Sequence, residues 1–180
     1  GYQLSGFNLY LCGDVPLGAG LSSSAAVECA VAFALSNINN LAVDPLALAL
    51  ISQKAEHTFA GVNCGIMDQF ASVFGKKDRA MLLDCQSLHY EYIPLVLEGY
   101  KLVLFNTNVK HSLGDSAYNK RRQQCEQGVQ WIKAHHPNVG LLRDATPEML
   151  DKYVKQKDEE VYQKCSYVVE EIDRVKQAVK

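Results

Sequence analysis

The chain has 180 residues, of which 48% are hydrophobic and 21% charged, a composition typical of a globular protein of one or two small domains. Its formal net charge of -2 does not favour binding to nucleic acid or to an anionic membrane, so we expect small molecules as its partners. No apolar run reaches the roughly 18 residues that a membrane-spanning helix needs, and residues 1–10 lack the basic start and apolar centre of a signal peptide.

Six cysteines are scattered along the chain without any CxxC pair: Cys12, Cys29, Cys64, Cys85, Cys125 and Cys165. Their spacing supports neither a zinc ribbon nor a thioredoxin-like redox site. We therefore expect reduced and mostly buried thiols. The chain also has no N-x-S/T glycosylation acceptor, and the two observations together predict a cytoplasmic protein.

The first part of the chain reads as a strand, a loop and then helices. Residues 7–16 are typical of a short strand that ends at a proline, and a glycine-rich loop leads from it into a helix over residues 22–37. Asp44 is a typical N-cap and precedes a proline at the first helical position, which predicts a helix over residues 45–60. A short helix over residues 66–74 follows and is closed by a glycine.

Branched and aromatic residues dominate three runs in the middle of the chain, which predicts an antiparallel sheet. These runs are residues 79–85, 88–95 and 100–109. The remainder is helical in pattern. Asp115 is a typical cap for a helix over residues 116–136, and the helical pattern of residues 147–180 is interrupted around residues 157–159. A boundary between subdomains is weakly marked near residues 98–99.

The string "PLGAGLSSSAA", residues 16–26, has the chemistry of a phosphate site. Gly18 and Gly20 can adopt backbone angles that other residues avoid, and they leave no side chain between a ligand and the backbone. The following helix offers unpaired N–H groups and the positive end of its dipole, and the serine hydroxyls add donors and an oxygen ligand for Mg²⁺. The lysine of a Walker A loop is absent. In isolation the string also fits a glycine turn with a serine N-cap.

The whole string resembles the central signature of the GHMP kinases, a family of small-molecule kinases. Further along, "AEHTFAGVNCGIMDQFAS", "NTNVKHSL" and "YNKRRQQCE" resemble the galactokinase branch of that family. The resemblance implies an α+β fold, with residues 1–98 as a partial N-terminal domain similar to the second domain of ribosomal protein S5 and residues 99–180 as the start of the C-terminal domain. It also implies ATP-dependent phosphorylation of galactose at the anomeric hydroxyl, giving galactose 1-phosphate.

The resemblance assigns the glycine and serine loop to ATP binding: Gly18, Ala19, Gly20, Leu21, Ser22, Ser23 and Ser24. It also implies that Ser24 and Glu56 hold Mg²⁺ between them, and a hydroxyl and a carboxylate suit the octahedral oxygen set of that ion. From the residues alone, Glu56 fits an exposed glutamate near a helix C-terminus, where its charge opposes the dipole and a neighbouring Lys54 or His57 can pair with it.

The sugar site implied by the resemblance consists of Gly65, Asp68 and Tyr118. Asp68 would be the catalytic base that accepts the proton of the sugar hydroxyl, and Gly65 would contact the sugar through its backbone. The residues alone allow simpler roles, because the dipole favours a carboxylate in a first helical turn and Tyr118 fits a packing aromatic. Residues 120–122 are basic and are expected to be a solvated helical face.

Two segments of the galactokinase pattern have no counterpart in these 180 residues, a "GEHTDY"-like sugar-binding segment and a "GGGFGG"-like glycine-rich segment. We therefore expect a fragment, inactive on its own, of a monomeric enzyme that acts on galactose and ATP and binds neither nucleic acid nor membrane. Two alternatives stay open: an N-acetylgalactosamine kinase, which shares these motifs, and a galactose-sensing regulator without turnover. The uninterrupted "GLSSSAA" favours an enzyme over such a regulator.

Overall fold

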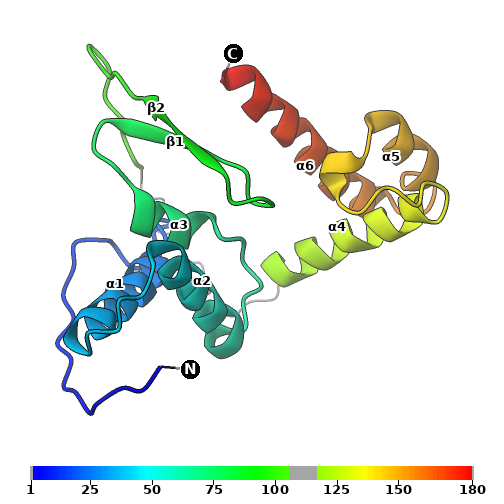
Figure 1. Ribbon diagram of the computed structural model, residues 1–180. Coiled ribbons are helices and arrows are strands. Elements are labelled where there is room, and N and C mark those ends of the chain that lie inside the picture. The colour runs from blue at the N-terminus through cyan, green and yellow to red at the C-terminus, as the bar shows by residue number, and fades with distance from the viewer. Residues whose placement is uncertain (1, 106–116, 180) are drawn as a thin grey trace. The chain divides into compact units, whose positions relative to one another are not determined.

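The computed structural model describes residues 2–105 and 117–179, and the chain forms two compact units, Gly1–Asp115 and Ser116–Lys180 (Figure 1). The described part contains several helices and a two-stranded sheet, which agrees with the predicted α+β class. The division between the units comes later in the chain than residues 98–99, and the assignment of the two predicted ranges to family domains stays a prediction. Within the described residues, no helix is long and apolar enough to cross a membrane.

The helices of the first unit pack against one another: α1 (Ser23–Ile38), α2 (Pro45–Ala55) and α3 (Met67–Phe74). Their predicted bounds are confirmed to within one residue, except that α2 passes into a π-helical turn, η1 (Glu56–Ala60). The predicted cap of α2 is present, because the Asp44 side chain accepts a hydrogen bond from the Ala47 amide at 3.0 Å. Gly61 follows the π-helical turn with a φ of 70°, a conformation that favours glycine.

A small antiparallel sheet lies beside α3 and is joined to it by aromatic side chains. It consists of β1 (Arg79–Leu83) and β2 (Tyr90–Pro94), and Leu83 pairs with Tyr90 in its register. Phe70 of α3 is 1% exposed, and its ring meets that of Tyr90 edge-on with 5.2 Å between the centroids. The core of the first unit therefore lies between its helices and one face of this sheet.

Two segments predicted as strands have no regular secondary structure. These are residues 7–16 and the described part of the third run, residues 100–105, so the prediction is wrong there, and residues 106–109 lie outside the described part. A strand needs a neighbour that pairs its N–H and C=O groups, and the described residues give these segments no such neighbour. Their large apolar side chains are consequently exposed, with Tyr10 at 89% and Phe105 at 87%.

The described part of the second unit is helical: α4 (Ala117–Lys133), a 3₁₀ turn η2 (Leu142–Asp144), α5 (Pro147–Tyr153) and α6 (Glu159–Ala178). The predicted interruption before α6 is confirmed, because Asp158 caps that helix by accepting a hydrogen bond from the Val161 amide at 3.0 Å. The predicted cap of α4, Asp115, lies outside the described residues. Apolar side chains from α4, α5 and α6 form the core of this unit, among them Ile132, Leu150 and Val161.

Candidate active site

The loop before α1 has the left-handed backbone that its glycines predict. Gly18 and Gly20 have φ of 70° and 72°, and Ser22 has φ of 55°, so the left-handed region recurs at every second residue. Backbones of this kind form anion-binding nests, in which successive N–H groups point to one side. The Ser22 side chain makes no capping hydrogen bond to α1, so the interpretation as a simple serine N-cap is wrong. The first turn of α1 therefore keeps uncapped N–H groups, as a phosphate site requires.

Glu56 is buried at the point where α2 passes into the π-helical turn. Its exposed fraction is 3%, and neither carboxylate oxygen has a hydrogen-bond partner among the described residues. The interpretation of Glu56 as an exposed glutamate is wrong, because the residue continues the buried face of α2 that carries Ala49 and Ser52. Burying a carboxylate without a partner costs several kcal/mol, and a cation bound beside it would offset that cost.

Glu28 of α1 lies against Glu56. Its Oε2 accepts a hydrogen bond from Nε2 of Gln69 at 3.2 Å, and Gln69 itself is 1% exposed. Burial and the neighbouring Glu56 carboxyl raise the pKa of Glu28 to about 7, and the Gln69 amide opposes that rise. Glu28 is absent from the residues selected by sequence. The available signal was its spacing, because residues four apart in a helix share a face and Glu28 follows Ser24 by four.

The carboxyls of Glu28 and Glu56 lie against each other, and Ser24 precedes Glu28 by four residues on the same face of α1. Hydroxyl and carboxylate oxygens are the hard ligands that Mg²⁺ prefers. The orphaned buried oxygens of Glu56 favour a cation at this place. The described residues hold no group of three or more His, Cys, Asp or Glu side chains able to bind a metal. A cation bound here would therefore complete its coordination with phosphate oxygens or water, as Mg²⁺ in nucleotide sites does.

The segment between η1 and α3 is fixed by side chains of the preceding helix. The carbonyl oxygen of Cys64 accepts hydrogen bonds from Gln53 Nε2 at 3.2 Å and from His57 Nε2 at 2.9 Å. A carbonyl oxygen only accepts, so this contact requires His57 to carry its ring proton on Nε2. Both bonds orient the peptide that joins Cys64 to Gly65, and with it the entry into α3, whose first turn carries Asp68.

The pKa of the Cys64 thiol is affected by nearby carboxylates. Burial is the main reason that its pKa is raised, and the negative charges of Glu56, Glu28 and Asp68 raise it further, against the effect of a hydrogen bond with Gln69. Such charge effects weaken with distance. The charges of Glu56, Glu28 and Asp68 thus all act on the Cys64 thiol.

Tyr118 lies in the first turn of α4, in the second unit, and is 50% exposed. The proposed sugar contact and the alternative of a packing aromatic both stay predictions for this half-exposed side chain. The basic side chains that follow agree with a solvated helical face, since Lys120 pairs with Glu160 at 3.3 Å and Arg122 pairs with Glu126 at 2.9 Å, both at exposed positions.

Comparison with known proteins identifies relatives of this chain. Residues 1–76 match the family described as GHMP kinases N terminal domain. The chain is 44% identical over 179 residues to a galactokinase of Thermotoga petrophila and 41% identical over 180 residues to one of Halalkalibacterium halodurans, and each match covers 99% of this chain. A crystal structure of Lactococcus lactis galactokinase complexed with galactose matches 92% of this chain with a TM-score of 0.84 and 35% identity. Residues 1–76 therefore match a GHMP kinase N-terminal domain, in a chain that resembles galactokinases over almost its whole length.

The chain spans about half the length of the curated relatives that it matches. It covers 49% of the Thermotoga petrophila protein and 46% of the Halalkalibacterium halodurans protein, and 43% of the Lactococcus lactis chain. The part that matches the GHMP N-terminal family contains the glycine and serine loop, Glu28, Glu56 and Asp68, whereas Tyr118 lies after it. The predicted GHMP kinase fold is confirmed by the structural match.

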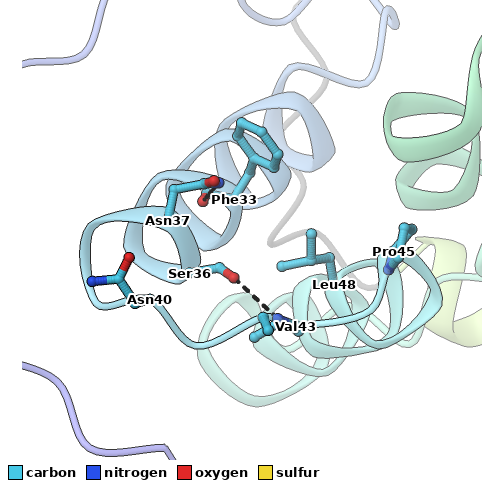
Figure 2. A pocket seen from close by; sticks show the side chains of 8 residues that line it. Phe33, Ser36, Asn37, Asn40, Val43, Pro45 and Leu48 are labelled. Atoms are coloured by element: carbon cyan, nitrogen blue, oxygen red, sulfur yellow. Dashed lines mark hydrogen bonds between the residues drawn. The ribbon is translucent and has the colours of Figure 1, made fainter.

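A cavity of about 450 Å³ lies between the C-terminal end of α1 and the start of α2, and Figure 2 shows its lining. Ser36 and Val43 meet there, and the Val43 amide donates a hydrogen bond to Ser36 Oγ at 3.3 Å. The lining contains no charged side chain. Because ATP and Mg²⁺ require charged or hydroxyl-rich surroundings, this cavity does not suit them.

Proposed function

We propose that the full-length protein containing this chain is a galactokinase, which transfers the terminal phosphoryl group of ATP to the anomeric hydroxyl of galactose and gives galactose 1-phosphate. The observation that carries the proposal is the buried, unpartnered Glu56, whose charge acts together with that of Asp68 on the Cys64 thiol, in the unit whose loop has the left-handed backbone of an anion site. The identity of 44% to a curated galactokinase supports the choice of galactose among the sugars.

The loop from Gly18 to Ser24 would bind the phosphates of ATP. Its left-handed φ values direct backbone N–H groups to one side, and the dipole of α1 favours negative charge at the same end. Ser24 and Glu56 would hold Mg²⁺, which neutralises phosphate charge when it is bound. The remaining loop residues, Ala19, Leu21, Ser22 and Ser23, would line the same site.

Asp68 would accept the proton of the sugar hydroxyl. A carboxylate in the first turn of α3 is oriented by the helix dipole, and an ionised carboxylate can align the hydroxyl before the proton moves. Gly65 would contact the sugar through its backbone, held by the hydrogen bonds of Gln53 and His57 to the preceding carbonyl. Tyr118 would provide a further contact to galactose.

The wider setting follows from the same proposal. Residues 1–98 and 99–180 would be parts of the N-terminal and C-terminal domains of the kinase. We expect a cytoplasmic monomer. The expectation of mostly buried thiols is wrong, because of the six cysteines only Cys29 and Cys165 are buried.

The proposal is tested by offering galactose, N-acetylgalactosamine or no sugar to the full-length protein with MgATP. We expect ADP release that depends on galactose, with galactose 1-phosphate identified by ³¹P NMR. The 180-residue chain, assayed in parallel, is expected to show no turnover. Preference for N-acetylgalactosamine would replace the proposed substrate, and binding of galactose without ADP release would indicate a sensor.

A further inference from the structure

Glu28 is a residue of α1 with three structural features that bear on its role. It lies on the face of α1 that carries Ser24, its carboxyl is next to that of Glu56, and it is held by the buried amide of Gln69. Glu28 is not among the residues that line the cavity of Figure 2. The role of Glu28 is therefore to be sought at the kinase site.

We propose that Glu28 is a further ligand of the divalent cation, so that the ion is held between Ser24 and Glu28 of α1 and Glu56 of the π-helical turn. The proposal rests on the proposed function only for the identity of the ion as Mg²⁺. It assigns a cation-binding role to Glu28, which belongs neither to the ATP-binding loop nor to the proposed catalytic base.

The first argument is the imbalance between donors and acceptors around Glu56. Both oxygens of Glu56 are buried without a partner in the described part of the chain, and the buried Oε1 of Gln69 is also without one. No ion pair among the described residues includes Glu28 or Glu56. A buried set of oxygen acceptors without a cationic side chain is the environment that a hard divalent ion balances.

The second argument is the way in which Glu28 is held. Gln69 donates to Oε2 of Glu28, so one oxygen is oriented by a buried side chain, and the carboxyl as a whole lies against that of Glu56. Gln69 directly follows Asp68 in α3. The same hydrogen bond thus connects the cation site to the helix that carries the proposed base, which makes Gln69 a positioning residue for the metal.

The test uses Glu28→Gln in the full-length protein, with Mn²⁺ as the probe in place of Mg²⁺. Glutamine keeps the length of the side chain and can still accept the hydrogen bond from Gln69, so the substitution removes mainly the charge. Binding of Mn²⁺ alone, without nucleotide or sugar, is measured by the EPR signal of the free ion. Glu98→Gln is the matched control, because Glu98 is an exposed glutamate of the same unit that makes no ion pair among the described residues.

We expect Glu28→Gln to weaken Mn²⁺ binding at least tenfold and Glu98→Gln to leave it unchanged. Because both carboxylates would bind one ion, adding Glu56→Gln to Glu28→Gln should cost much less than Glu56→Gln costs alone. Glu28→Asp, which keeps the charge on a shorter side chain, should retain part of the affinity. It also provides a test should Glu28→Gln fail to fold.

Two results overturn the inference: a Mn²⁺ affinity of Glu28→Gln within twofold of the parental value, or a parental protein that binds no Mn²⁺. Galactose turnover of the parental protein is measured on the same preparation. Loss of Mn²⁺ binding in Glu28→Gln without any parental turnover contradicts the proposed function alone. Parental turnover with unchanged Mn²⁺ binding in Glu28→Gln contradicts the role of Glu28 alone.

Discussion

The two units of the chain differ in what they bury. In the second unit, apolar side chains such as Ile132 and Leu150 fill the core, and Gln124 Oε1 is the one buried side-chain oxygen without a partner among its described residues. The first unit buries the charged Glu56 and the amide of Gln69 with orphaned oxygens. Burying oxygens without hydrogen-bond partners lowers the stability of the fold. Proteins retain such oxygens where their lone pairs bind a ligand. The contrast therefore separates a structural core from a ligand site within one chain.

The largest effect that we expect is catalytic, from Asp68→Asn in the full-length protein. The substitution removes proton acceptance and keeps the size of the side chain, so kcat should fall by at least about 10², the lower end for general base catalysis, while ATP affinity stays near its original value. Asp44→Asn is the matched control, since it makes the same change at the start of α2, where asparagine caps nearly as well as aspartate.

A small effect of Asp68→Asn on kcat would argue against a catalytic role. If Asp68 only stabilises the start of α3, the cost is about 1 kcal/mol or less of stability, with kcat unchanged in the folded fraction. Turnover of Asp68→Asn within about fivefold of the parental rate, which corresponds to ~1 kcal/mol of barrier, would remove Asp68 from the reaction.

The next effect is on stability and belongs to the second unit. Ile132 is 0% exposed, so Ile132→Ala should lower the free energy of unfolding by about 2 to 5 kcal/mol through lost burial and the cavity left behind. In the 180-residue chain the only tryptophan, Trp131, packs against this core, and its fluorescence during urea unfolding reports the loss. Addition of Mg²⁺ should not restore the lost stability, and restoration would contradict the separation of the two units' roles.

A smaller effect compares two helix starts. Asp158 accepts a capping hydrogen bond from Val161, so Asp158→Ala should cost about 1 kcal/mol of stability. Ser22 makes no capping bond to α1, so Ser22→Ala should change stability by no more than ~0.5 kcal/mol. Equal losses in thermal unfolding of the two variants would show that Ser22 is a cap after all.

The sequence predicts helices well where the signal is local. The cap and proline at the start of α2, the interruption before α6 and the glycines with left-handed φ are all set by neighbouring residues, and the structure confirms them. The strands predicted over residues 7–16 and 100–109 fail in their described parts, because a strand depends on a partner that side-chain alternation does not reveal. Local patterns thus predict elements whose hydrogen bonds are local.

The candidate site shows the same limit. The loop and Asp68 are visible in the sequence because their motifs are contiguous, whereas the burial of Glu56 depends on packing between helices. The dipole argument favours an exposed Glu56, and it is overridden because the residue lies on the buried face of α2. The spacing of Glu28 from Ser24 is visible in the sequence, but its contacts with Glu56 and Gln69 are not, since these residues are distant in the chain.

The central claim, that the first unit buries carboxylates for a ligand and not for stability, is tested most directly by the thermal midpoint of Glu56→Gln in the full-length protein without divalent metal. Glutamine has nearly the shape of glutamate and removes the acidic group that is buried beside Glu28. Since relief of an uncompensated buried charge stabilises the folded state, we predict a midpoint equal to or higher than that of the parental protein. A clearly lower midpoint in the presence of a chelator would contradict the account, because it would show that the Glu56 carboxylate contributes to the stability of the fold.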